Sequence, residues 1–222
     1  MTQKMPSAVR DHAMQIAHHE MGHYVVARAL GFATGGVTLT VTMDLRHQAG
    51  ASITLARSMS SIDAIKDYLE ARMMVLFAGA MGQSLASEQS SGKRVDKRKA
   101  ATILKGEQGA EQDYAKIREL GHLLRNITYP DTDAASSDRT AAELKEITDR
   151  LWFRTQTIVE ELADTITGLA GMLVDGMVIV EQWGRAADTY EGVLTREVLE
   201  GLRLVQAIPA ASVLKGTSGV AG

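Results

Sequence analysis

Residues 17–24 read AHHEMGHY, in which HEMGH places His19 and His23 four positions apart with Glu20 directly after the first. Four residues make about one helical turn, so a helix here would project both imidazoles from one face, where they could bind one metal ion. Glu20 then stands where a carboxylate can take a proton from a water on that metal without being a ligand. His18 points about 100° around the helix from His19, so we interpret it as a supporting or exposed residue. The alternative interpretation is two histidines on an ordinary helix.

A catalytic zinc ion usually takes three protein ligands and leaves its fourth position to water, so two histidines need a partner elsewhere in the chain. The chain contains no cysteine, which leaves only histidine and carboxylate ligands. An extended metzincin motif would need Gly at position 26 and His at position 29, and Val26 and Ala29 exclude it. A thermolysin-like site would take a glutamate from a second helix, for which Glu70 is the candidate.

The composition narrows the class of protein. With 222 residues and 45% hydrophobic content, the chain is long enough for one large domain or two small ones with a real core. A net charge of −3 gives none of the basic excess that nucleic-acid binding requires. The lack of cysteine fits a reducing compartment. Because no apolar run is long enough to span a bilayer and the first residues do not resemble a signal peptide, we expect a cytoplasmic protein that binds neither nucleic acid nor membrane.

The elements that must position the histidines follow from the hydrophobic periodicity. Residues 7–30 have helical spacing and end at Gly31. Alternation then predicts a half-buried strand over 37–45 and, after a turn at RHQAG, a second short strand over 49–56. We therefore expect an α+β fold that is mainly α-helical, with a small sheet or hairpin near residues 36–56.

Helical periodicity returns in four later segments. They cover residues 60–86, 109–127, 140–177 and 194–206. Gly79 and Gly82 in the first of them should allow close packing against another helix. Residues 87–100 are polar and basic, which predicts a mobile surface loop.

Two motifs in this order resemble a known family. HEMGHYVVARALGF resembles the start of the peptidase domain of the FtsH family of ATP-dependent zinc metalloproteases, and residues 74–85, MVLFAGAMGQSL, resemble the glycine-containing helix that follows in that family. GAEQD, which contains Gly109, Ala110 and Asp113, is similar to the family's G-A-x-x-D motif. Residues 140–177 resemble its closing helices. The resemblance covers roughly residues 8–200.

The resemblance implies a zinc-dependent endopeptidase. Its Zn²⁺ ion would be bound by His19, His23 and Asp113, with Glu20 as general base. The substrate would be a peptide or an unfolded or flexible protein chain, held against the edge of a strand with little side-chain selectivity. The residues implied for that strand are Ala49, Gly50, Ala51, Ser52, Ile53 and Thr54.

The resemblance also implies domain boundaries in the chain and the partners of the protein. It implies a peptidase domain over residues 1–205, with an insertion or mobile loop at about 87–107, followed by a loose tail over 206–222. No counterpart of the family's ATPase module or transmembrane segments is expected, so unfolding of folded substrates would need a separate ATPase. The family's ring assembly makes a homo-oligomer one expectation.

The sequence departs from the family pattern in the glycine-containing helix. Ala80, Gln83 and Ser84 stand where the family carries an arginine and an acidic pair. This departure supports a second hypothesis, in which the chain is a catalytically degenerate, metal-stabilised interaction module or a subunit of a separate ATPase.

Overall fold

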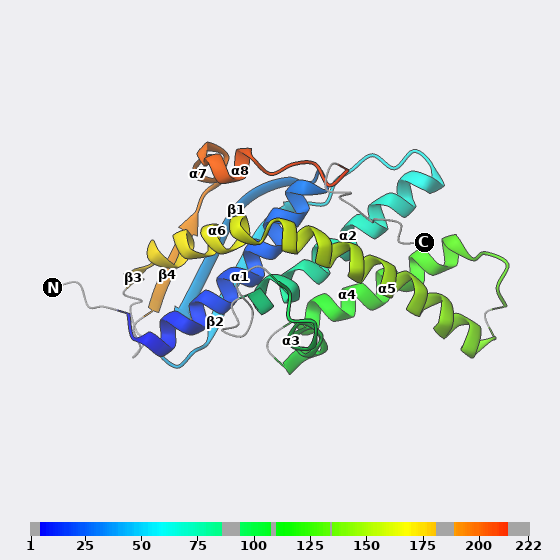
Figure 1. Ribbon diagram of the computed structural model, residues 1–222, viewed down its shortest axis with the longest axis horizontal. Helices are drawn as coiled ribbons and strands as arrows, with labels where there is room; N and C mark the ends of the chain where they lie inside the picture. Colours follow the sequence, from blue (N-terminus) through cyan, green and yellow to red (C-terminus); the bar gives the residue numbers. More distant parts are fainter. Residues whose placement is uncertain (1–4, 86–93, 108–109, 134, 181–188, 213–222) are drawn as a thin grey trace, which may run out of the picture.

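Two long helices, α1 (Ser7–Ala29) and α2 (Ile62–Leu85), pack against each other at the centre of the computed structural model (Figure 1). The structure describes residues 5–85, 94–107, 110–133, 135–180 and 189–212. The first helix ends as its sequence predicts, because Gly31 adopts a φ of +79°, which a residue with a side chain rarely does. The HEMGH motif thus lies within a continuous helix.

A four-stranded antiparallel sheet covers part of α1. The strands are β1 (Ala33–Thr42), β2 (His47–Thr54), β3 (Val178–Val180) and β4 (Thr189–Leu194), in the order β2-β1-β4-β3. β1 alternates as predicted, with Val37, Leu39 and Val41 buried. β2 lies at one edge of the sheet and contacts α1.

The turn between β1 and β2 lies earlier than the sequence predicts. We expected a turn at RHQAG, but β2 already begins at His47 and the chain turns between Thr42 and Arg46. The Thr42 amide donates a hydrogen bond to the carbonyl of Arg46, and the Leu45 amide donates one to the carbonyl of Thr42. Leu45 adopts a φ of 63°, which is unusual for a residue other than glycine. The predicted turn is therefore wrong for His47 to Gly50, and only Arg46 belongs to the turn.

Seven further helical segments, which range from one turn to 25 residues, complete the described part of the fold. They are α3 (Lys97–Thr102), a π-helical turn η1 (Ile103–Glu107), α4 (Glu111–Thr128), α5 (Ser137–Glu161), α6 (Ala163–Asp175), α7 (Arg196–Gly201) and α8 (Arg203–Gln206). The single helical region predicted over 140–177 is two helices, which are separated at Leu162. The mainly α-helical α+β fold class is confirmed.

Two segments that we expected to be loose are ordered where the structure describes them. Within the insertion predicted over 87–107, Asp96 caps the N-terminus of α3, where its side chain accepts a hydrogen bond from the Lys99 amide, and Ala100 and Ile103 are buried. Within the tail predicted over 206–222, the Ala211 amide donates to the carbonyl of Ala29. The loop prediction is wrong for residues 97–107, which are helical. The loose tail stays a prediction, because 213–222, like 86–93, lie outside the described part.

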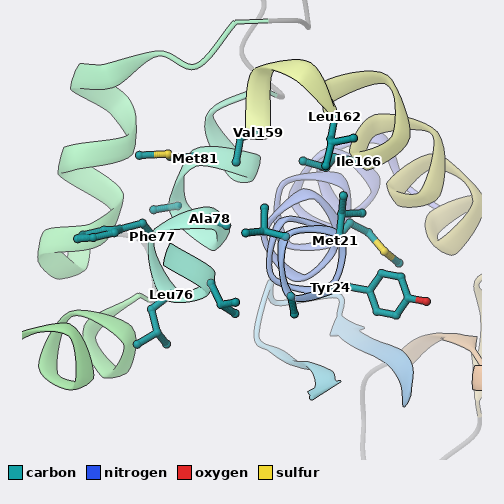
Figure 2. Packing of buried hydrophobic residues seen from close by; sticks show 14 of the residues in the cluster. Met21, Tyr24, Leu76, Phe77, Ala78, Met81, Val159, Leu162 and Ile166 are labelled. Atoms are coloured by element: carbon teal, nitrogen blue, oxygen red, sulfur yellow. The ribbon is translucent and has the colours of Figure 1, made fainter. Parts of the chain in front are cut away.

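The hydrophobic core forms where α1, α2 and the C-terminal helices meet. Figure 2 shows Ala78 of α2 facing α1, Met21 and Tyr24 extending from α1 on the side away from α2, and Leu162 and Ile166 packed against α1 from the junction of α5 and α6. These side chains are all at most 6% exposed. Within the described residues, no helix combines the length and the apolar character needed to cross a membrane.

A buried ion pair fixes α4, the helix that carries Asp113, against α5. Arg125 Nε donates to Glu143 Oε2 at 2.8 Å, and Thr132 Oγ1 donates to Glu143 Oε1 at 2.6 Å. Burial alone would raise the pKa of Glu143, but these hydrogen bonds hold it below its ordinary value. The carboxylate therefore stays charged and keeps the two helices in register.

Glycines allow the backbones of α1 and α2 to approach closely. A Cβ added at Gly22 would lie 2.3 Å from the carbonyl oxygen of Ala78, and one at Gly82 would lie 2.5 Å from that of His18. Side chains at these positions would force the helices apart. The prediction that Gly82 allows close packing is confirmed, and Gly22, a spacer in the HEMGH motif, is its counterpart on α1.

We expect Gly22→Ala to destabilise the protein by about 1–3 kcal/mol, because the added methyl group meets backbone atoms of α2 that no side-chain rotation can relieve. The matched control is Gly171→Ala in α6, where an added Cβ has no neighbour within 4 Å. That variant should be neutral or more stable by up to about 1 kcal/mol. Urea unfolding of both variants measures the difference, and equal effects would contradict the close approach.

Candidate metal centre

The histidines of the HEMGH motif and Asp113 come together although they are distant in the chain. His19 and His23 lie one turn apart on α1, and Asp113 lies in the first turn of α4, 94 residues beyond His19. The two imidazole Nε2 atoms are 3.0 Å apart. Asp113 Oδ2 lies 3.0 Å from His23 Nε2 and 3.3 Å from His19 Nε2. The three residues could therefore hold one metal ion.

The donor atoms fit zinc in type and in spacing. Two imidazole nitrogens and one carboxylate oxygen are a ligand set that catalytic zinc sites use. Ligand atoms that surround a tetrahedral zinc at 2.0–2.1 Å lie about 3.3 Å from one another, which is within a few tenths of an ångström of the distances here. Within the described residues, this is the only group of three or more such side chains close enough to bind one ion.

Helix α2 orients both imidazoles through hydrogen bonds with their Nδ1 atoms, on the ring edge opposite the metal-binding Nε2 atoms. His19 Nδ1 lies 2.9 Å from Gln83 Oε1, and His23 Nδ1 lies 2.7 Å from the carbonyl oxygen of Val75. Because these oxygens can only accept a hydrogen bond, they favour the tautomer in which Nδ1 carries the proton and Nε2 is free to bind a metal. Gly79 leaves the space for this arrangement, since a Cβ there would lie 2.4 Å from His23 Nε2.

The role of Gln83 was not predicted from the sequence, in which this residue is only a departure from the family pattern. Its side-chain amide is buried and forms a hydrogen bond with His19, a candidate metal ligand. The available signal was the polar pair Gln83 and Ser84 in the mainly apolar segment 73–85, where a buried amide needs a hydrogen-bond partner.

The charges of the three candidate ligands favour binding of a positive species, which can be a proton on an imidazole or a metal ion. Burial alone would raise the pKa of Asp113, but its hydrogen bonds with His19 and His23 hold that pKa well below its usual range. Burial alone would lower the pKa of His23, but the bond and charge of Asp113 raise it. A carboxylate thus faces a readily protonated imidazole, and a metal ion would bind in place of the proton.

Glu20 lies beside this group and is held by the edge strand. Its Oε2 accepts a hydrogen bond of 2.9 Å from the Ala51 amide of β2. That amide points away from β1, because a backbone N–H paired with β1 could not reach the helix. Glu20 is half-buried and is not one of the three residues that form the metal-binding group. This position suits a carboxylate that moves protons.

A cleft of about 470 Å³ opens onto these residues. Of the strand residues expected to bind substrate, four line the cleft and two do not. The four are Ala49, Gly50, Ala51 and Ile53. Ser52 and Thr54 belong to the same strand but not to the lining, and Ser52 is directed towards Gly35 of β1. Arg72 and Lys116, which the sequence analysis did not single out, also line the cleft and add positive charge to it.

The structure contradicts two further expectations, that Glu70 could be the third ligand and that His18 could be exposed. Glu70, the alternative third ligand, forms two hydrogen bonds of 2.7 and 3.1 Å with Arg150 and does not join the histidines. His18 is buried rather than exposed, and its Nδ1 lies 2.8 Å from the carbonyl oxygen of Met14. Burial lowers the pKa of His18, so this imidazole is a neutral part of the helix interior.

Comparison of the chain with models of protein families and with curated proteins finds no match. The resemblance to the FtsH peptidase domain therefore stays a prediction.

Proposed function

We propose that this chain is a zinc-dependent endopeptidase, similar to the peptidase domain of the FtsH family, that hydrolyses peptide bonds in unfolded or flexible protein segments. The observation that carries the proposal is the convergence of His19, His23 and Asp113 on an open cleft, with the Glu20 carboxylate held beside them. A histidine pair on an ordinary helix would need neither the distant aspartate nor the oriented Nδ1 atoms.

The residues divide the chemistry of peptide hydrolysis between them. His19, His23 and Asp113 would hold the zinc ion, which would supply a Lewis acid able to polarise a peptide carbonyl and to make water more acidic. Glu20 takes a proton from the attacking water at its carboxylate and passes it to the leaving nitrogen. The Ala51 amide keeps that carboxylate in place through both transfers.

Strand β2 provides a surface for an extended peptide. Since the Ala51 N–H points away from β1, the alternation of a strand directs the backbone groups of Ala49 and Ile53 to the same open edge. A substrate strand can hydrogen-bond to these groups, which recognises the backbone rather than the side chains. Such recognition requires an unfolded or flexible segment. A separate ATPase that unfolds substrates is the corresponding partner in this proposal.

Metal removal tests the function. The purified chain should cleave casein and a flexible peptide, should lose this activity when a chelator removes its metal, and should regain it when Zn²⁺ is restored. Metal analysis of the active preparation should give one zinc per chain. Cleavage that persists unchanged in the metal-free protein, or a chain that binds no zinc, would refute the proposal.

A further inference from the structure

A second pair of histidines lies at the rim of the same cleft. His12 is on α1, two turns before His19, and His47 is the first residue of β2 and lines the cleft. His12 Nε2 lies 3.1 Å from His47 Nδ1, and the two ring centroids are 5.1 Å apart in an edge-to-face arrangement. Neither residue belongs to the candidate metal centre.

The geometry of this pair repeats that of the two histidines in the candidate centre. His19 and His23 face each other through nitrogens 3.0 Å apart, with ring centroids 4.7 Å apart and also edge to face. In both pairs the two nitrogens face each other at hydrogen-bonding distance, so that one ring can donate a proton to the other. A transition-metal ion can replace that proton, since nitrogens bound to one tetrahedral ion lie about 3.3 Å apart.

The surroundings of the second pair leave it ready to bind a cation. Burial is the main cause that lowers the pKa of His12, and the neighbouring His47 lowers it further. A backbone hydrogen bond with Leu45 raises this pKa but does not cancel the decrease. The His12 imidazole is therefore neutral at pH 7, as a metal ligand must be. His47 is exposed, so water can complete the coordination. The nearest acidic side chain of the turn, Asp44, is bonded to Arg46 and Thr42.

We propose that His12 and His47 form a second, weaker transition-metal site, which takes a Zn²⁺ or Cu²⁺ ion and is distinct from the site of His19, His23 and Asp113. Two imidazoles without a protein carboxylate suit late first-row ions, and Cu²⁺ should bind more tightly than Zn²⁺. The bound ion joins α1 to the first residue of β2, and so fixes the end of the strand that lines the cleft.

Calorimetric titration of the full chain with Zn²⁺ tests this site without relying on activity. The wild-type protein should bind a second equivalent more weakly than the first. His12→Asn and His47→Asn should each lose only the weaker step, whereas His122→Asn, which removes an exposed histidine of α4, should keep both. Thermal unfolding should agree, because filling the second site raises the midpoint only in proteins that retain the pair.

The outcomes separate this inference from the proposed function. Zinc binding to the wild-type chain that is unchanged in both His12→Asn and His47→Asn would overturn the second site. A wild-type chain that binds only one weak equivalent, which both variants abolish, would instead refute the candidate centre and leave the second site standing. His47 is exposed, so its variant should fold even if the half-buried His12 proves sensitive to substitution.

Discussion

Replacing Glu20 by glutamine should lower kcat/KM for peptide cleavage by about 10²–10⁴-fold, because the amide lacks the basicity to accept a proton from water. The substitution should slow the chemical step and should leave the folded structure unchanged. Glutamine keeps an oxygen that can accept the 2.9 Å hydrogen bond from the Ala51 amide. The side chain is also outside the metal-binding group, so zinc content should be unchanged.

The matched control for this variant is Glu111→Gln. Glu111 is another carboxylate that lines the cleft, but it is exposed and belongs to the first turn of α4. Its loss should change kcat/KM little. Initial rates with a flexible peptide, together with metal analysis of each variant, measure both effects. A Glu20→Gln protein that cleaves as fast as the wild type would exclude Glu20 as general base and favour the hypothesis of a metal-stabilised interaction module.

Asp113→Asn should weaken zinc binding more than the roughly 10–100-fold that loss of an outer hydrogen-bond partner typically costs. An amide is a neutral and poorer ligand than a carboxylate, and two imidazoles alone leave the site incomplete. Peptide cleavage at limiting zinc should fall in parallel. Equilibrium dialysis against zinc buffers measures the affinity.

Two comparisons make the Asp113 result specific. Glu111→Gln, two residues away in the same helical turn, should bind zinc as the wild type does. The metal-free stability of Asp113→Asn should be measured separately, because this variant also removes the ion pair with His23. If zinc affinity were unchanged in Asp113→Asn, the third ligand would have to lie elsewhere.

The sequence predicted those parts of the site that local periodicity determines. The spacing of His19 and His23 and the helix that carries them follow from the 3.6-residue repeat, and the structure has both. The proximity of Asp113 depends on how α4 packs against α2, which no local pattern shows. It was predicted only through a resemblance in motif order.

The parts that the sequence did not predict depend on tertiary contacts. β3 has three residues and β4 six, too few for a clear alternation, and they form strands by pairing with each other and with β1. The interpretation of 87–100 as a loop rested on its charge, whereas α3 is held by a single buried face around Ala100. The many polar side chains of α3 belong to its exposed face, and its buried face is too short to produce a clear apolar pattern in the sequence.

The close approach of α1 and α2 also limits how this protein could be engineered. Replacing a helical glycine by alanine normally raises stability by about 0.5–1 kcal/mol. At Gly22 and Gly79 that route is closed, because the missing methyl group of Gly22 lets the two backbones meet and that of Gly79 makes room for the imidazoles. Thermostability and chemistry are therefore coupled at this helix pair, and stabilising substitutions have to be sought in distant elements such as α6.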